Sequence, residues 1–205
     1  MSGYNYHGES STKHSVEKKY APKIDKINVL AAMSPNKTGM TMILLGWNLA
    51  LRSKEIAGLR VANFDFQDMT VEIPNEIAKG DSGGIIAVVS RRFMREMQDY
   101  ISETGLEDAD FILCHGKARK PYSTRHIRRM AKEIGKKCGM PWFHTHMLRH
   151  SMARWLLESG YNMSFVKAYL RHKSVRMTID LYGHFDIEDR KRQAAEGRQP
   201  TWVYD

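Results

Sequence analysis

One β-rich stretch interrupts a chain that otherwise shows the apolar spacing of amphipathic helices. Between residues 64 and 89, short β-branched runs alternate with Gln-Asp, Pro-Asn and Gly-Asp-Ser-Gly-Gly, which are turn-forming sequences. The runs are Phe64–Phe66, Thr70–Ile73, Glu76–Lys79 and Ile85–Val89. We therefore predict a mainly α fold with a small three-stranded antiparallel β-sheet, which is an α+β class.

Helical spacing is found on both sides of this stretch. The expected helices begin near Ile27 and continue as Met40–Leu51, Ser53–Leu59, Arg91–Glu103, Ser123–Lys137, about 147–158, 164–170, 175–182 and Ile187–Glu196. The apolar run Phe111–Cys114 has the character of a short strand. Ser53 is placed to cap the helix that it begins, and Gly139 is placed where a helix would end.

The 205 residues are predicted to form one domain with two appendages. Residues 1–24 are polar and aperiodic, so we expect a flexible tail; residues 25–190 form the domain, and residues 191–205 form a C-terminal tail. No window approaches the ~18 apolar residues of a membrane helix, and the first residues lack the apolar run of a secretion signal. We therefore expect a cytoplasmic protein without a membrane partner.

Cysteine usage excludes two classes of small protein. The only cysteines are Cys114 and Cys138, and no CxxC pair occurs. A disulfide framework and a cysteine zinc cluster are therefore not expected.

Positive charge is concentrated in one part of the chain. The net charge is +9, with 32 Lys and Arg against 23 Asp and Glu, at a pI near 9.5. Residues 115–184 contain 15 Lys and Arg and three acidic residues, which makes this part +12 and the rest −3. Such asymmetry is typical of a surface that binds a polyanion, most often nucleic acid, although a solvated lysine-rich face would look the same.

The segment His144–His150, His-Thr-His-Met-Leu-Arg-His, is the densest group of chemically active side chains. On a helix, four apolar residues would face the core: Leu148, Met152, Trp155 and Leu156. His146 and Arg149 are three residues apart on another face and could converge on one phosphate. Polar decoration of an amphipathic helix remains an alternative, and a zinc site is disfavoured because no HExxH motif or third spaced ligand occurs.

Three further motifs accompany this segment. They are the run Ala50–Leu59, which reads ALRSKEIAGL, the triplet Leu170-Arg-His172, and Asp180–His184, which reads DLYGH. Together the four motifs resemble the catalytic domain of the tyrosine recombinases, the phage-integrase family, over about residues 25–190. That family carries an Arg in an LRxxE turn, an Arg in HxLRH, a His in LGH and a nucleophilic Tyr downstream, in this order.

The resemblance implies a fold, a reaction and a role for each matching residue. The implied catalytic set is Arg52, Lys79, His146, Arg149, His172 and Tyr182, with Glu55 in support. The two arginines would bind the scissile phosphate, the histidines would complete the ring of donors, and the tyrosine would attack. Lys79 would protonate the leaving 5′ oxygen, although Lys54 or another lysine could also reach the DNA backbone.

The chemistry of such a set is coherent. Guanidiniums stabilise the charge that grows on nonbridging oxygens in the transition state. A phenol is a poor nucleophile at neutral pH and a 5′ alkoxide a poor leaving group, so both need proton transfer. The expected product is a 3′-phosphotyrosyl protein and a free 5′ hydroxyl. No metal or cofactor is expected, and no P-loop is found.

Two features depart from the family pattern. Arg171 replaces the usual glycine of LGH, which removes a favourable left-handed residue and adds a cation beside the phosphate. His172 and Tyr182 are ten residues apart, which is one residue longer than in some family members. Tyr182, at the end of an apolar run, could instead be a core residue.

The resemblance favours a site-specific DNA recombinase that integrates, excises or inverts DNA as a tetramer on its sites and is a monomer when free. A type IB-like relaxing topoisomerase and a catalytically silent DNA-binding regulator are the alternatives. Few residues precede the expected domain, so the helical domain that clamps DNA in longer members is either absent, as in compact invertases, or cut away. Double-stranded DNA, in the nucleoid, is the expected partner.

Two surfaces are expected to make contacts. The residues expected to touch DNA are Arg125, Arg128, Arg129, Lys132, Arg171 and Lys173. A solvated basic helix explains Ser123–Lys137 almost as well. In the C-terminal tail, Trp202 and Tyr204 would anchor the segment on a neighbouring protomer or fold back on their own domain.

Overall fold

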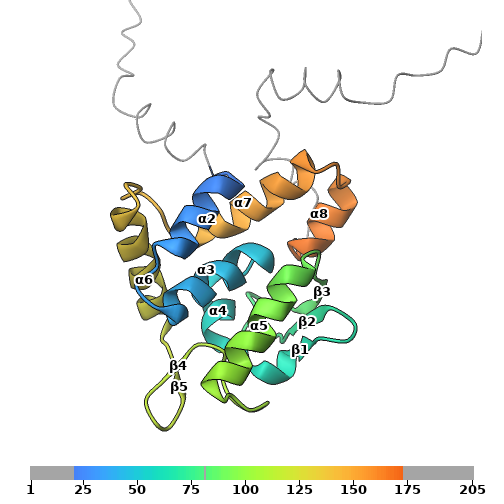
Figure 1. The fold of residues 1–205 in the computed structure, drawn as a ribbon. Helices are drawn as coiled ribbons and strands as arrows, with labels where there is room; N and C mark the ends of the chain where they lie inside the picture. The colour runs from blue at the N-terminus through green and yellow to red at the C-terminus, as the bar shows by residue number, and fades with distance from the viewer. Residues whose placement is uncertain (1–20, 81, 173–205) are drawn as a thin grey trace, which may run out of the picture.

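In the computed structural model, which describes residues 21–80 and 82–172, helix α3 (Lys37–Asn48) lies at the centre of the fold (Figure 1). Its sequence, KTGMTMILLGWN, is apolar or small on most faces, so it is buried along most of its length. It packs against helices α2, α4, α5, α6 and α7. A Cβ at Gly46 would lie only 2.5 Å from Leu148 Cδ1, so this glycine permits the close approach of α3 and α7.

The surrounding helices are short and mostly amphipathic. They are α2 (Ile24–Ala32), α4 (Ser53–Gly58), α5 (Arg91–Thr104), α6 (Thr124–Lys137), α7 (Thr145–Glu158) and α8 (Met163–Tyr169), with a 3₁₀ turn η1 at Val61–Asn63. Each predicted helix within the described residues is confirmed, with ends that move by a few residues. The helices predicted at 175–182 and Ile187–Glu196 lie outside the described residues.

Polar caps explain where several helices begin and end. The side chains of Asn36, Ser90, Ser123 and Asn162 accept hydrogen bonds from the first turns of α3, α5, α6 and α8. Gly139 follows the end of α6 at φ +71°, in the left-handed region, as its position in the sequence predicts.

The predicted three-stranded antiparallel sheet is confirmed. Its strands are β1 (Phe64–Asp65), β2 (Thr70–Ile73) and β3 (Gly84–Ala87), in the order β1-β2-β3. Val71 at the centre pairs with Phe64 and Ile86 and is fully buried.

Two strand predictions need correction. Glu76–Lys79 is a turn, because the amides of Ile77 and Ala78 both donate to the Pro74 carbonyl and coil the chain. The run Phe111–Cys114 contributes only its last residue to a strand, since β4 (Cys114–His115) pairs with β5 (Lys120–Pro121) in a separate hairpin.

The core stripe predicted on α7 is confirmed in three of its four positions. Leu148, Met152 and Leu156 are fully buried. Trp155 is half-buried and packs edge-to-face on Trp47, with ring centroids 5.9 Å apart. This stripe fixes the rotation of α7 and therefore the direction of its polar side chains.

No helix in residues 21–80 and 82–172 has the length and apolar character needed to cross a lipid bilayer.

Candidate active site

The site is built first on the segment that leads into α4. Arg52 occupies the N-cap position, and Glu55, three residues on, accepts the Arg52 backbone N–H at 2.8 Å. The same carboxylate also accepts a hydrogen bond from the Arg52 guanidinium, with Nη1 and Oε1 2.8 Å apart. Glu55 is fully buried, so the charged head of Arg52 is held by a partner that cannot move into solvent.

This arrangement corrects the expectation that Ser53 caps α4. The cap is one residue earlier, because the Glu55 side chain satisfies the Arg52 amide. The Ser53 hydroxyl is instead buried and shares a 2.7 Å hydrogen bond with Thr145 Oγ1 at the start of α7. The two helices that carry Arg52 and Arg149 are therefore joined at their N-terminal ends.

Arg149 ties the site together from α7. Arg149 is 3% exposed. Its Nη1 donates to the Ala50 carbonyl at 2.7 Å, and its Nη2 donates to the Leu170 carbonyl. One guanidinium thus links the backbone just before Arg52 to the backbone just before His172. On the same helix, His146 lies on the exposed side.

The segment after α8 closes the site. Arg171 has φ +52°, and its Nη2 lies 2.8 Å from Glu55 Oε2. Arg171 was expected to contact DNA, but the residue is 9% exposed and pairs with this buried carboxylate. His172 is buried as well, and its amide donates to the Lys167 carbonyl at 3.1 Å.

We call Arg52, Arg149 and Arg171 the arginine cluster. These residues come from three segments spread over more than a hundred positions, and Glu55 pairs with two of them. Three guanidiniums and one carboxylate leave a net charge of +2 at the site. Such a concentration of fixed donors suits a phosphate group.

The histidines near the arginine cluster are held in their neutral form. Burial, with the nearby charges of Arg149, Arg52 and Arg171, lowers the pKa of His172 to about 4. His146 is exposed as a residue, but partial desolvation of its ring lowers its pKa as well, with contributions from Arg149, His144 and Arg52. A neutral imidazole can donate from one ring nitrogen and accept at the other, which a protonated ring cannot.

His150 is a neighbour for which the sequence predicts no role. Burial, together with His146 and Arg149, lowers its pKa to about 4, and its ring centroid lies 5.7 Å from that of His146. Its place directly after Arg149 was the only sequence signal that pointed to it.

Lys79 and Lys54 approach the site through one turn. Lys79 is exposed between β2 and β3, and its carbonyl accepts the Ser82 hydroxyl at 2.9 Å. Arg52 Nη1 in turn lies 3.4 Å from Ser82 Oγ, which ties the Lys79 turn to the arginine cluster. Lys54 Nζ donates to the Glu76 carbonyl at 2.7 Å, so it helps to hold the same turn.

Ser82 is therefore a site residue that the sequence reasoning missed. It lies in the Gly-Asp-Ser-Gly-Gly run, which was interpreted only as a turn.

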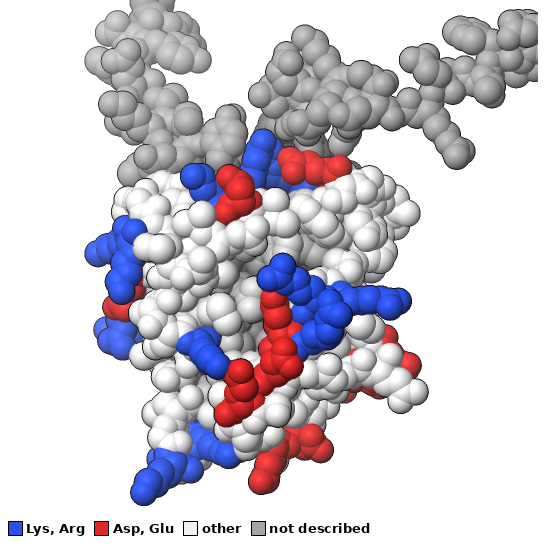
Figure 2. Space-filling view, in the orientation of Figure 1, with Lys and Arg blue, Asp and Glu red and all other residues white. Residues whose placement is uncertain are grey.

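The basic face of α6 is a second group of cations, on a helix that carries no member of the arginine cluster. Its four candidate DNA contacts, Arg125, Arg128, Arg129 and Lys132, are all exposed, and blue side chains follow the edge formed by α6 in Figure 2. The opposite face of the helix, which includes Ile127 and Ile134, is buried. Lys173 and Tyr182 lie outside the described residues.

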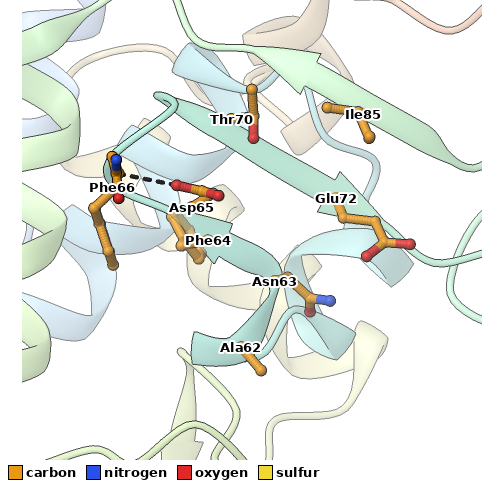
Figure 3. Close-up of a pocket in the computed structure, with 9 residues that line it drawn as sticks. Ala62, Asn63, Phe64, Asp65, Phe66, Thr70, Glu72 and Ile85 are labelled. Atoms are coloured by element: carbon orange, nitrogen blue, oxygen red, sulfur yellow. Dashed lines mark hydrogen bonds between the residues drawn. The ribbon is translucent and has the colours of Figure 1, made fainter.

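Two other features bear on the choice of site. A hollow on the outer face of the three-stranded sheet is lined by residues such as Asp65, Glu72 and Ile85, and includes none of the predicted site residues (Figure 3). In residues 21–80 and 82–172, no three His, Cys, Asp or Glu side chains gather as a metal site would require.

Comparison with known proteins identifies the family of this chain and several relatives. The family model described as "Phage integrase family" matches residues 23–188. The tyrosine recombinase XerC of Pseudomonas entomophila (strain L48) is 30% identical over 148 residues, which are 70% of this chain and 47% of that protein. Transposase A from transposon Tn554 of Staphylococcus aureus (strain Mu50 / ATCC 700699) is 33% identical over 110 residues, 51% of this chain and 30% of that protein. The chain thus spans about half or less of the length of these relatives.

Solved structures agree on the fold. The crystal structure of XerA recombinase superposes with a TM-score of 0.72 at 22% identity, covering 87% of this chain and 65% of that one. The XerH site-specific recombinase, in a post-cleavage complex with palindromic difH substrate, gives a TM-score of 0.68 at 18% identity, covering 92% and 55%. The predicted fold class is confirmed.

Proposed function

The chain belongs to the phage integrase family, and from this premise we propose that it is a site-specific DNA recombinase that cleaves and rejoins DNA through a 3′-phosphotyrosyl intermediate. The observation that carries the proposal is the arginine cluster. Arg52 and Arg149 are fixed by Glu55 and by the Ala50 and Leu170 carbonyls, and His172 follows directly on the segment that Arg149 holds.

The proposed reaction uses these groups on one phosphodiester. The Tyr182 phenol oxygen bonds to phosphorus as the bond to the 5′ oxygen breaks, and its proton passes to a base in the site. Arg52 and Arg149 stabilise the negative charge that grows on the nonbridging oxygens. His172 and His146 donate hydrogen bonds to the same oxygens or accept the phenol proton while neutral.

The leaving 5′ oxygen takes a proton from a general acid, for which Lys79 is the candidate. Ser82 places the Lys79 turn against Arg52, which supports this assignment over a remote lysine. Rejoining is the reverse step, in which a 5′ hydroxyl attacks the phosphotyrosine. Energy is conserved in that ester, so no nucleotide is consumed.

The proposed partner is double-stranded DNA in the nucleoid, with residues 25–190 as the catalytic domain and residues 1–24 and 191–205 as tails. The structural neighbours include XerH bound to difH substrate and the Tn1549 transposon integrase in complex with transposon right end DNA. The exposed α6 residues and Lys173 would contact the backbone or the major groove. A monomer in solution would assemble as a tetramer on two sites, with the C-terminal tail docking on a neighbour.

The test uses a pool of nicked suicide duplexes with a randomised window. Cleavage near the nick releases a short strand that diffuses away, so the protein stays linked to the DNA and is recovered by denaturing electrophoresis. We expect an adduct that sequencing resolves to a preferred site, and none with Tyr182→Phe. No adduct from the unchanged chain contradicts the proposal, and relaxation of a plasmid without that site would favour a topoisomerase.

A further inference from the structure

Arg171 occupies a position that a side chain disfavours. It follows Leu170, the C-cap residue of α8, at φ +52°, a conformation that glycine adopts without strain. In the family pattern given above, this position of the LGH motif carries glycine. An arginine held there against its backbone preference calls for a compensating interaction.

The side chain is also buried at a cost. Its relative exposure is 5%, and among the described residues its Nε and Nη1 atoms have no hydrogen-bond partner. A buried guanidinium with unpaired donors is unfavourable unless another group holds its charge. The unfavourable backbone conformation and the cost of burial both indicate that the contact of Nη2 with Glu55 stabilises Arg171 in this position.

That contact joins Arg171 to the anchor of Arg52. Glu55 Oε2 lies 2.8 Å from Arg171 Nη2, and Oε1 lies 2.8 Å from Arg52 Nη1. With glycine at 171, the carboxylate would neutralise Arg52 one for one. With arginine there, the three residues keep a net charge of +1, which adds to that of Arg149.

We propose that Arg171 is a positioning residue for strand cleavage, which acts through Glu55 to fix the Arg52 guanidinium and to keep the carboxylate from cancelling its charge. This inference rests on the proposed function. Arg171 differs in this from a DNA contact, which would meet the phosphate itself, and from a structural clip, which would affect folding alone.

The test compares Arg171→Met with Arg171→Lys in single-turnover adduct formation at saturating DNA, on the duplex that the unchanged chain selects. We expect Arg171→Met to slow adduct formation about 10- to 100-fold, as loss of a group that orients a ligand does. In Arg171→Lys, the logarithm of the rate should recover by at least about half of that loss. Unchanged adduct formation in Arg171→Met overturns the proposal.

A matched control is available in the hairpin β4–β5. Arg119 also has a positive φ, +47°, and pairs with a carboxylate, Asp110, away from the arginine cluster. Arg119→Met is expected to leave the rate unchanged. A loss that is equal in both variants, or one that follows the fraction unfolded and is not rescued by lysine, identifies a structural clip and contradicts positioning.

DNA affinity separates positioning from direct contact. In a Tyr182→Phe background, loss of a phosphate contact would reduce the magnitude of the slope of log affinity against log salt concentration by about 1. We expect the slope of Arg171→Met to match that of the parent. A salt slope of smaller magnitude, with an unchanged cleavage rate at saturating DNA, would make Arg171 a DNA contact and overturn the proposal.

Two further measurements test the route through Glu55. If Arg171 acts through this carboxylate, Glu55→Gln with Arg171→Met is no slower than the slower single variant, whereas multiplied effects contradict the route. The Arg52 Nε–H signal in protein labelled with ¹⁵N-arginine needs no DNA. We expect it to shift in Arg171→Met and not in Arg119→Met. An Arg52 Nε–H signal that does not shift in Arg171→Met overturns the inference. This holds even if the parent chain forms no adduct, a result that would contradict the proposed function separately.

Discussion

The arginines of the arginine cluster and those of α6 share one chemistry and have opposite surroundings. Arg149 and Arg171 are 3% and 9% exposed, and each has a fixed partner from a distant part of the chain. Arg125, Arg128 and Arg129 are exposed, and the partners of Arg129 are His126 and Glu133 on its own helix.

The difference shows how a chain divides its positive charge between two tasks. A guanidinium bound to main-chain carbonyls or to a buried carboxylate is held in place before a ligand arrives, and such preorganised donors stabilise a transition state. An exposed arginine moves freely and is screened by salt, so it contributes affinity that varies with ionic strength. The net charge of +9 does not indicate how the cations are divided between these two tasks.

The largest expected effect comes from breaking the buried ion pairs. Glu55→Ala leaves Arg52 and Arg171 without their carboxylate, and we expect unfolding free energy to fall by about 3–5 kcal/mol, with loss of cleavage. Denaturant titration measures it. Glu133→Ala removes the carboxylate of an exposed pair, 3.8 Å from Arg129 Nε, and should cost under about 0.5 kcal/mol. Equal losses in the two variants would contradict the comparison.

The next effect is expected in Arg149→Lys. Lysine keeps the charge but cannot bond to the Ala50 and Leu170 carbonyls and to a phosphate together, so we expect adduct formation to slow about 10²- to 10³-fold. Arg154→Lys on the same helix, where the arginine pairs with Glu158, is the control and should stay near the parent rate. A near-parental rate for Arg149→Lys would remove Arg149 from the reaction.

Stability is expected to depend on pH through the buried His172 and the half-buried His150. Folding lowers the pKa of His172 and His150 from the usual 6.5 to about 4. Between these values the unfolded chain binds more protons, so stability falls as pH drops from 6.5 to 4 and is insensitive to these groups at higher pH. The loss should be on the order of 1–3 kcal/mol per histidine. Thermal unfolding across pH 4–8 measures it; His172→Asn should flatten the curve, and an unaltered curve would contradict the shift.

The smallest effect is expected on α6. Arg128→Ala removes an exposed cation, so we expect a few-fold loss of DNA affinity and a salt slope lowered by about 1, with unchanged stability and unchanged cleavage at saturating DNA. Affinity measured at several salt concentrations tests this. Asp68→Ala, an exposed change on the sheet side, is a control for surface substitution. A cleavage rate that falls at saturation would place Arg128 in the reaction.

Periodicity predicted the helices because each buries one apolar face, most of them against α3, and a buried face requires apolar residues at regular spacing along the helix. The sheet was predicted from its turns. Glu76–Lys79 was wrong because Pro74 turns the chain back on itself, and the cap at Ser53 was wrong because Thr145, 92 residues away, offered that hydroxyl a partner. The turn at Pro74 is local, whereas the contact of Ser53 with Thr145 joins residues so distant in sequence that it has no local signature.

The site shows the same division. The ordered motifs indicated that Arg52, Arg149 and His172 belong together, and the structure brings them together. The motifs did not indicate that Arg149 is buried against two carbonyls or that Arg171 turns inward to Glu55. Spacing along a helix gives the face of a residue, whereas its partners depend on segments that only the tertiary fold brings close.

If the arginine cluster activates one phosphorus for attack by Tyr182, the DNA in the covalent adduct must be attached to this tyrosine. Mass spectrometry of the trypsin-digested adduct should find the nucleotide phosphate on peptide 177–190, in which Tyr182 is the only tyrosine. A nucleotide linked to another residue, or an adduct that persists in Tyr182→Phe, would contradict the account.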